Sequence, residues 1–416
     1  MRTLEDYRRI IGNDAVGEIH NAARRLRGKH VVHINATYQG GGVAEMLETL
    51  VPLMNDVGLE AGWRIIPGPH EYFKVTKAFH NALQGADIDL NDLKKHIYKT
   101  TNEAFSVFTH FKHDIVFIHD PQPAALIKYY ARRQPWIWRC HIDLSSPNEE
   151  LWEFLEQFIV AYDEVVVSHE RYRQPALPQE QVIFHPAIDP LSTKNMDLPD
   201  HTIEEHIGRA GIPTDKPFIL QISRFDPWKN QPGLIDAFKI VREEVPCRLV
   251  LCGGMAADDP EGVEIYTKVR DSAHDLLESG DLILMTDAST VMVNSLQRSA
   301  AVVVQNSIKE GFGLTVTEAM WKGTPVVATN VGGIPLQITD RENGLLCEAN
   351  NAGQLADRIL RVLNDPELGE EMGRRAKETV RERFLITRLL KQDLDLFCHL
   401  LECSPYSARE LAMMGV

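Results

Sequence analysis

The fold of this chain is decided by the stretch AAVVVQNSIKEGFGLTVTE, residues 300 to 318. Its apolar run from Ala300 to Val304 predicts a buried strand, and the glycines at 311 and 313 predict a turn into a helix. A strand that ends in a Gly-rich bend presents free backbone N–H groups at a helix N-terminus, where the macrodipole favours an anion. The stretch therefore predicts an α/β unit with a phosphate site.

Two glutamates lie on either side of this turn. Glu310 falls in the loop, and Glu318 falls about one turn into the helix. The two carboxylates are expected to flank a ligand that carries negative charge at its centre. A plain strand-turn-helix unit with two solvated glutamates is the alternative that this stretch alone leaves open.

A second strand and loop run from Phe218 to Asn230. The strand is apolar except at Gln221, and the loop carries Arg224 and Lys229. Arginine can bind phosphate oxygens in pairs and lysine adds a mobile point charge, so the two suit a diphosphate. A surface charge pair is the alternative, but the loop follows the carboxyl end of a strand, where open α/β sheets bind ligands.

These segments resemble the retaining glycosyltransferases of family four, which have the two-domain GT-B fold. The matching residues are Ser223-Arg224 through Lys229, the E-x7-E pair Glu310 and Glu318, the loop Tyr38 to Val43, and the segment His141 to Asp143. Within that family, three segments look like the trehalose-forming glycosyltransferring synthases, and the likeness covers roughly residues 1 to 400. These segments are Leu4 to Tyr7, His33 to Val43 and Trp138 to Asp143.

The resemblance implies retaining transfer of glucose from a nucleoside-diphosphate glucose to glucose, forming α,α-trehalose reversibly. The partners are then small molecules: the nucleotide sugar, with UDP, ADP or GDP, together with glucose and trehalose. A trehalose phosphorylase that uses inorganic phosphate is the main alternative, and a non-catalytic nucleotide-sugar sensor is an alternative of another class. A glycoside hydrolase would leave the cationic loop at 224 to 229 unexplained.

The resemblance also implies roles for residues of the second half. Arg224 and Lys229 would hold the leaving diphosphate, and the amides of Gly313, Leu314 and Thr315 would assist them. Fixed cations and N–H groups that strengthen as charge develops lower the barrier, so no metal and no other cofactor is expected. Glu310 would contact the transferred sugar, and Glu318 would accept hydrogen bonds from the ribose hydroxyls.

In the first half, the resemblance places Gly41 and Gly42 beside the donor phosphate. Consecutive glycines at 40 to 42 allow close backbone approach to a ligand at a helix start, with a tight strand-helix connection or a hinge as the alternative. His141 would contact the hydroxyls of the donor sugar, with a structurally satisfied histidine as the alternative. Asp143 is expected either to orient its loop or to bind acceptor hydroxyls, and Tyr38 is expected on the acceptor side. No P-loop and no full G-x-G-x-x-G fingerprint occurs in the sequence, which disfavours an ATPase or a nicotinamide enzyme.

Short apolar strands alternate with helical patterns along the chain, which predicts parallel α/β sheets. The proline-rich segment from 185 to 215 is the expected linker between two Rossmann-like, doubly wound domains that form a GT-B fold. The first domain is expected over residues 1–213, the second over 214–385, and a final helix from about 386 is expected to pack back on the first domain. The expected strands are His30–Asn35, Ala61–Ile66, Ile115–His119, Trp136–Cys140, Glu164–Ser168, Gln181–Phe184, Phe218–Ile222, Arg248–Cys252, Leu282–Met285, Ala301–Val304, Val326–Thr329 and Gly344–Cys347.

Composition narrows the classes of function. The 416 residues predict two or three domains, and the net charge of −15 argues against a nucleic-acid or anionic-membrane surface. The six cysteines form no C-x-x-C pair, and His110, His113 and His119 lack further ligands, so no metal site is expected. Without a signal peptide or a membrane-spanning run, the expected location is the cytoplasm. The final stretch 404–416 would suit a flexible tail or, through its apolar ending at 411–416, an oligomer contact such as a homodimer.

Overall fold

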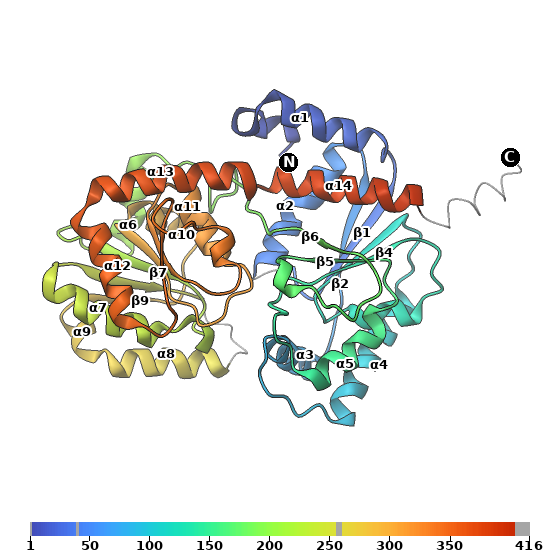
Figure 1. The fold of residues 1–416 in the computed structure, drawn as a ribbon, viewed down its shortest axis with the longest axis horizontal. Coiled ribbons are helices and arrows are strands. Elements are labelled where there is room, and N and C mark those ends of the chain that lie inside the picture. The colour runs from blue at the N-terminus through green and yellow to red at the C-terminus, as the bar shows by residue number, and fades with distance from the viewer. Residues whose placement is uncertain (1, 39–40, 255–259, 404–416) are drawn as a thin grey trace, which may run out of the picture. The chain divides into compact units, whose positions relative to one another are not determined.

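The computed structural model describes residues 2–38, 41–254 and 260–403. The chain forms two compact units, each with its own parallel sheet (Figure 1). The first unit contains the chain up to Ala187 and the segment that begins at Ile386, and the second contains Ile188–Leu385. The expected glycine loop at 39–40 and the apolar ending at 411–416 lie outside the described residues.

The first unit is built on a six-stranded parallel sheet in the order β2-β1-β3-β4-β5-β6. Its strands are β1 (His30–Asn35), β2 (Glu60–Ile65), β3 (Ile115–His119), β4 (Trp136–Arg139), β5 (Glu164–Val167) and β6 (Gln181–Ile183). Its helices are α1 (Arg8–Arg24), α2 (Gly42–Asp56), α3 (His70–Leu83), α4 (Asp92–Phe108), α5 (Glu149–Ile159) and α14 (Ile386–Cys403), with the 3-10 turns η1 (Leu4–Tyr7), η2 (Ala124–Tyr129) and η3 (Glu170–Tyr172).

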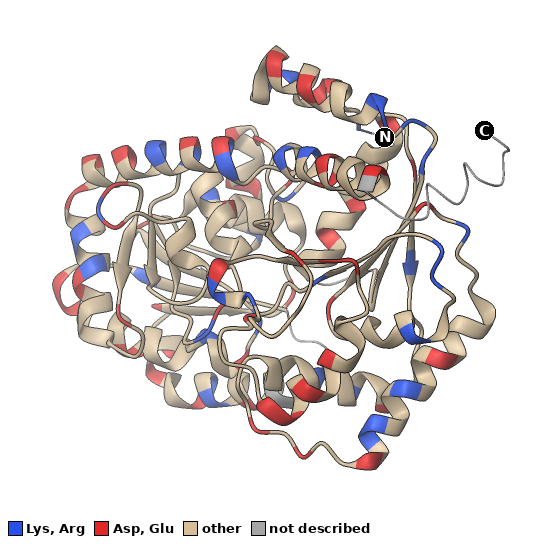
Figure 2. Ribbon diagram, turned by 45° about the vertical axis from the view of Figure 1, so that its right-hand side comes forward, with Lys and Arg blue, Asp and Glu red and all other residues tan. Residues whose placement is uncertain are grey.

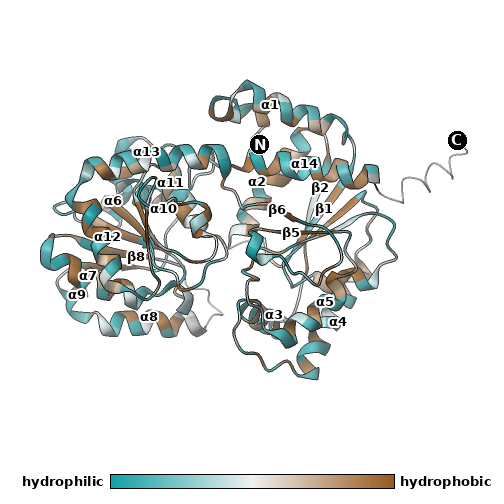
Figure 3. Ribbon diagram, in the orientation of Figure 1, coloured by the Kyte–Doolittle hydropathy of each residue, from teal (hydrophilic) through white to brown (hydrophobic). Residues whose placement is uncertain are grey.

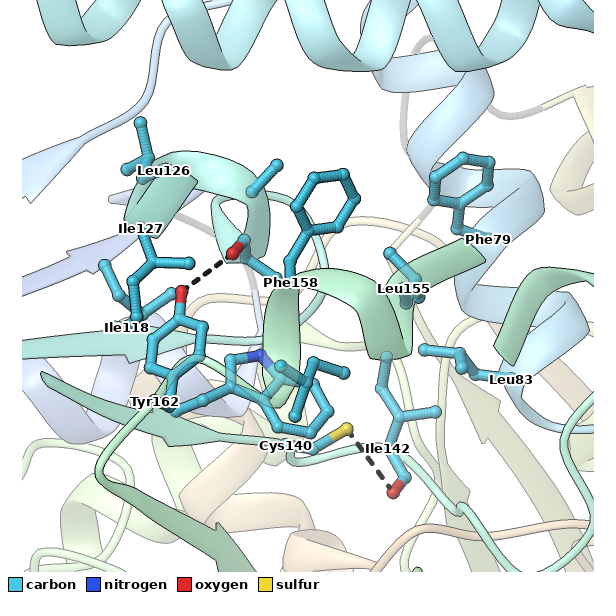
Figure 4. Packing of buried hydrophobic residues seen from close by; sticks show 14 of the residues in the cluster. Phe79, Leu83, Ile118, Leu126, Ile127, Cys140, Ile142, Leu155, Phe158 and Tyr162 are labelled. Carbon is cyan, nitrogen blue, oxygen red and sulfur yellow. Dashed lines mark hydrogen bonds between the residues drawn. The ribbon is translucent and has the colours of Figure 1, made fainter. Parts of the chain in front are cut away.

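Side chains of these strands alternate between two faces of the sheet. One face carries the main hydrophobic core, in which Ile118 and Cys140 pack with α3, α5 and η2 (Figure 4). The hydroxyl of Tyr162 in this core donates to the Ala124 carbonyl at 2.8 Å, so its polar end is satisfied. The opposite face of β3 carries Phe117, whose ring meets the ring of Phe397 on α14 edge to face at 6.1 Å.

The second unit is built on another six-stranded parallel sheet, in the order β12-β11-β10-β7-β8-β9. Its strands are β7 (Phe218–Ile222), β8 (Arg248–Cys252), β9 (Leu282–Met285), β10 (Val302–Gln305), β11 (Val326–Thr329) and β12 (Leu345–Cys347). Its helices are α6 (Asp200–Arg209), α7 (Gln231–Glu244), α8 (Pro260–Ser272), α9 (His274–Glu278), α10 (Thr290–Ser299), α11 (Leu314–Trp321), α12 (Ala352–Asn364) and α13 (Pro366–Arg383), with η4 (Pro227–Lys229) and η5 (Ile334–Leu336).

Hydropathy and charge follow this layering in both units. Strands such as β1 and β8 are hydrophobic, whereas the outer faces of the helices are hydrophilic (Figure 3). Basic and acidic residues alternate along the outer helices (Figure 2), and on α13 they form the ion pairs Arg374–Glu371 and Arg381–Glu378. Within the described chain, no helix combines the length and apolar character needed to cross a bilayer.

The predicted strands are confirmed to within about one residue at each end. The sequence places the end of the first domain at residue 213, whereas the compact units divide between Ala187 and Ile188. Residues 188–213 lie with the second unit because α6 packs against α10 there. The final helix α14 groups with the first unit, where it packs against α1 and α2.

Candidate functional site

The carboxylate of Glu310 is the centre of a hydrogen-bonded cluster in the second unit. Its Oε2 lies 2.6 Å from Nζ of Lys229, and it accepts from Oγ of Ser307 at 2.9 Å and from Nε2 of Gln305 at 3.2 Å. The side chains of Lys229 and Glu310 are 18% and 11% exposed, so the ion pair is largely shielded from solvent. This charge-assisted cluster fixes the position of the carboxylate.

The local fold brings these groups together from two strand ends. Gln305 ends β10, and its Oε1 accepts from the hydroxyl of Thr315 on α11 at 3.0 Å. Gly313 is the N-cap of α11 and has φ 87°, a left-handed conformation that favours glycine. The first amides of the helix, at Gly313, Leu314 and Thr315, are thereby set at a helix N-terminus, as the sequence predicts.

The loop after β7 carries the two predicted cations. Asp226 caps η4 by accepting from the Trp228 amide at 2.9 Å, and it also lies 3.4 Å from the guanidinium of Arg224. Arg224 is more than half exposed, at 54% of its side chain, whereas Lys229 is directed to Glu310. The two cations therefore have different surroundings: one is presented to solvent, and the other is engaged by a carboxylate.

Glu318 occupies a more deeply buried position on α11. Its side chain is 3% exposed, its Oε1 lies 3.3 Å from Nζ of Lys194, and its Oε2 has no hydrogen-bond partner among the described residues. Lys322, one turn further along the chain, donates to Oδ1 of Asn195 at 2.9 Å and to the Glu318 carbonyl at 3.2 Å. Burial lowers the pKa of Lys322 to about 7, although Glu318 opposes that shift.

In the first unit, the predicted glycines lie at the start of α2. Gly41 is the N-cap with φ 111°, and Gly42 is the first residue of the helix. The predicted acceptor-side residues differ in exposure: Tyr38 is 66% exposed, whereas Asp143 is buried and accepts from the Ser145 amide at 2.8 Å. The carboxylate of Asp143 therefore orders its own loop in this structure.

His141 follows β4 and is held at both its backbone and its ring. The backbone N–H donates to Oδ1 of Asp120 at 2.8 Å, and the ring nitrogen Nε2 lies 3.0 Å from Nδ1 of His119. Asp120 has φ 63°, and its burial raises the pKa of its carboxyl to about 7. Burial lowers the pKa of His141 well below its usual value, so this imidazole is neutral at pH 7.

Several residues of these clusters are absent from the sequence-based prediction. Lys194 lies in the proline-rich segment that the sequence predicts to be a linker, whereas Gln305 and Ser307 follow the predicted strand Ala301–Val304 and have no predicted role. The sequence presents His119 as a possible metal ligand at the end of a predicted strand and His33 as part of a resembling segment, but it assigns neither to the site. His33, His119 and His141 lie in or just after three apolar strands, which is a signal in the sequence. It indicates a cluster only when the strand order is known, because β1, β3 and β4 are neighbours in the sheet.

The described residues contain no recognisable set of metal ligands. Over 2–38, 41–254 and 260–403, no group of three or more His, Cys, Asp or Glu side chains is placed to hold an ion. The described cysteines Cys140, Cys247, Cys252, Cys347 and Cys398 are free and buried. Metal-independent catalysis stays a prediction that activity must test.

Comparison with known proteins identifies both units. The N-terminal domain model of trehalose synthase matches residues 33–174, and the model of glycosyl transferases group 1 matches residues 202–379. The chain is 46% identical to a trehalose synthase of Pyrococcus horikoshii over 402 residues, which cover 95% of this chain and 96% of that protein. It is 30% identical to a trehalose phosphorylase of Grifola frondosa, over 91% of this chain but only 58% of that protein.

The fold has solved counterparts. A UDP-forming α,α-trehalose-phosphate synthase of Burkholderia xenovorans, in complex with glucose-6-phosphate, superposes with a TM-score of 0.72 at 11% identity. The superposition covers 90% of this chain and 100% of that one, which shows the GT-B fold. With full-length identity to trehalose synthases added to this fold, the chain belongs to the trehalose synthase family of GT-B glycosyltransferases.

Proposed function

We propose that this glycosyltransferase moves glucose from a nucleoside-diphosphate glucose to glucose, forming α,α-trehalose reversibly and with retention at the anomeric carbon. The observation that carries the proposal is the 46% identity to a trehalose synthase along nearly the whole of both chains. The cluster around Glu310 supports it, because it sets a carboxylate, a cation and a helix N-terminus side by side in one unit.

Arg224, Lys229 and the first amides of α11 bind the diphosphate in this proposal. The ammonium of Lys229 has three donors, so it can keep its contact with Glu310 and still donate to a phosphate oxygen. The helix start at Gly313 adds N–H groups that have no partner within the helix. These charges strengthen their interaction as the diphosphate leaves, which stabilises the transition state more than the bound substrate.

Glu318 binds the two ribose hydroxyls of the nucleotide. Lys194 holds Oε1, whereas Oε2 is a buried acceptor without a partner among the described residues, and a ribose hydroxyl would satisfy it. Glu310 binds hydroxyls of the transferred glucose and stabilises positive character at its anomeric carbon. His141 is the residue proposed to contact hydroxyls of the donor sugar.

Retention follows from a displacement on one face of the sugar. The bond from the anomeric carbon to the leaving phosphate oxygen breaks while the incoming hydroxyl oxygen forms its bond on the same side. The hydroxyl proton passes to the leaving phosphate oxygen, so no separate base is required. Closure that excludes water would favour transfer to the sugar over hydrolysis.

Transfer should proceed without a divalent metal, because protein cations and N–H groups supply the charge that a metal would otherwise provide. The purified enzyme should keep its full rate after treatment with EDTA. A matched sample with added magnesium or manganese provides the control. A rate that collapses in EDTA and returns with either ion would contradict the proposed role of Arg224 and Lys229.

The proposed reaction is tested in its reverse direction by proton NMR of the anomeric signals. Trehalose is incubated with the enzyme in four tubes that contain UDP, ADP, GDP or inorganic phosphate. An α-linked nucleotide glucose with free glucose in one tube is the expected result, and it names the nucleotide. α-Glucose 1-phosphate in the phosphate tube alone would instead make the enzyme a phosphorylase, and no product in any tube would refute trehalose as the product.

A further inference from the structure

Three imidazoles form a hydrogen-bonded chain in the first unit. Nδ1 of His33 lies 3.0 Å from Nε2 of His119, and Nδ1 of His119 lies 3.0 Å from Nε2 of His141. The rings are stacked at centroid distances of 5.3 Å for both pairs. His33 and His119 are fully buried, whereas His141 is half-buried, so the chain runs from the interior toward an accessible ring.

The sheet itself sets the spacing of this chain. His33 pairs in register with Phe117 on the neighbouring strand, and His119 pairs with Arg139. Because side chains two residues apart lie on one face of a sheet, His119 shares the face of Phe117 and His141 shares that of Arg139. The ring of Phe117 stacks on His33 at 5.0 Å and on His119 at 4.8 Å, which fixes both planes.

All three rings are neutral at physiological pH. Burial, together with the charge of Arg139, lowers the pKa of His33 to about 3 and moves the pKa values of His119 and His141 in the same direction. A neutral imidazole has one N–H and one lone pair. Each of the two contacts needs one donor and one acceptor, so the protons of the three rings must all point the same way along the chain.

The buried end decides this direction. Nε2 of His33 has no hydrogen-bond partner among the described residues. If the protons pointed inward, this nitrogen would carry a buried N–H without an acceptor, and orphaned buried N–H groups are rare in proteins. If they point outward, it carries only a lone pair, and each ring is protonated at Nδ1. The outward direction therefore avoids an unsatisfied buried N–H donor at His33.

We propose that His33 and His119 are positioning residues that fix His141 as the Nδ1–H tautomer through this chain. Nε2 of His141 then accepts from His119, and its Nδ1 offers a single N–H to the ligand. The partner of that N–H is an oxygen lone pair, which under the proposed function belongs to a hydroxyl of the transferred glucose. This last step rests on the proposed function, whereas the tautomer itself is a property of the free protein.

The tautomer is measured on the full-length wild-type protein labelled with ring-¹⁵N histidine. Long-range ¹H–¹⁵N correlation separates protonated from unprotonated ring nitrogens, and the His141 signals are assigned by their loss in His141→Gln. A protonated Nδ1 and an unprotonated Nε2 at His141 are expected. A protonated Nε2, or signals averaged between two tautomers, would overturn the proposal even if transfer activity is normal.

A matched pair of variants tests the consequence for catalysis. The side chain of His119→Asn keeps an amide donor near the position of Nδ1, whereas His119→Leu has a similar size and no donor. His119→Asn should keep kcat within about threefold, and His119→Leu should lose about tenfold or more, with loss of the single His141 tautomer. Equal losses in the two variants would show a merely structural role and overturn the proposal.

His113→Asn provides the control, since this histidine lies outside the chain of rings and should leave kcat and the His141 signals unchanged. If His119→Leu does not fold, the wild-type spectrum still decides the tautomer. If the wild-type enzyme shows no glucosyl transfer, the proposed function fails, yet the spectrum still tests the inference about His33 and His119.

Discussion

At the scale of single residues, the two glutamates of the E-x7-E pair have different surroundings. Glu310 is bound by one cation and two neutral donors through the same oxygen, Oε2. Glu318 is more deeply buried and has one oxygen near Lys194 and one without a described partner. A carboxylate with an unsatisfied buried acceptor is suited to bind hydroxyl donors, whereas a carboxylate fixed beside a lysine is suited to act on charge.

Substitution of the two glutamates should therefore give different kinetic defects. Glu310→Gln keeps the shape but removes the charge near the reacting carbon, so kcat should fall by about 100-fold or more while KM for the nucleotide sugar changes little. Glu318→Ala should mainly raise that KM, by about tenfold, because it removes ground-state binding. Steady-state kinetics with varied donor checks both, and identical profiles would contradict the division of roles.

The buried histidines should also leave a signature in the pH dependence of stability. Folding lowers the pKa of His119, so below pH 6.5 the unfolded chain binds a proton on this ring that the folded protein does not bind. This difference costs no stability well above pH 6.5, and it lowers the free energy of unfolding as the pH falls below that value. His119→Asn removes this titrating ring, so the variant does not suffer that loss of stability at low pH. Its stability deficit relative to wild type should shrink by about 1.4 kcal/mol between pH 7.5 and pH 5.5.

Urea unfolding of both proteins at the two pH values measures that change. Asp120 acts in the opposite sense, because its raised pKa of about 7 makes the folded protein bind a proton that the unfolded chain does not. Asp120, His33 and His141 are present in both proteins, so their own contributions cancel to first order in the difference. A deficit that is the same at both pH values would show that His119 is not held neutral by the fold.

At the scale of elements, the turn from β10 into α11 positions the site. A Cβ at Gly313 would lie 3.3 Å from Cγ of Glu310, and the backbone there has φ 87°. Gly313→Ala should therefore cost about 1–2 kcal/mol in stability and also displace the carboxylate, with a fall in kcat of about tenfold or more. Thermal unfolding and initial rates check the two effects.

Gly280→Ala is the matched control. Gly280 lies in the same unit with φ 71°, but a Cβ there would meet nothing within 4 Å. The two variants should lose similar stability, because both force alanine into the left-handed region, whereas only Gly313→Ala should lose activity. Equal activities would show that the turn does not position Glu310.

Elements of this kind are the part of the structure that the sequence predicts well. Apolar runs bounded by polar or glycine residues predict the twelve strands of the described chain, because the central strands are buried in parallel sheets and even the edge strands β2 and β6 are mostly half-buried. The glycines at 311 and 313 predict the start of α11. Contacts between distant loops are not predicted, since Lys194 reaches Glu318 across 124 positions and no local pattern marks it.

At the scale of the whole molecule, the chain leaves the first unit at Ala187 and returns to it at Ile386. The returning helix α14 supplies Phe397, which packs on Phe117, and also Asp393, whose buried carboxyl has a pKa raised to about 7. The face of the sheet that carries the histidine chain is therefore completed by residues that follow the second unit in sequence. The hydrogen-bonded chain of histidine rings should therefore depend on α14.

Phe397→Ala tests this dependence. Loss of a fully buried phenylalanine costs about 3–5 kcal/mol, and the cavity would open beside Phe117, which stacks on His33 and His119. Hydrogen exchange read by mass spectrometry should show faster exchange in β3 of the first unit and unchanged exchange in β8 of the second. Asp395→Ala, at a position 56% exposed on the same helix, should change neither. Unchanged exchange in β3 would mean that the first unit is stable without this contact, whereas selective loss would make α14 part of the support of His141.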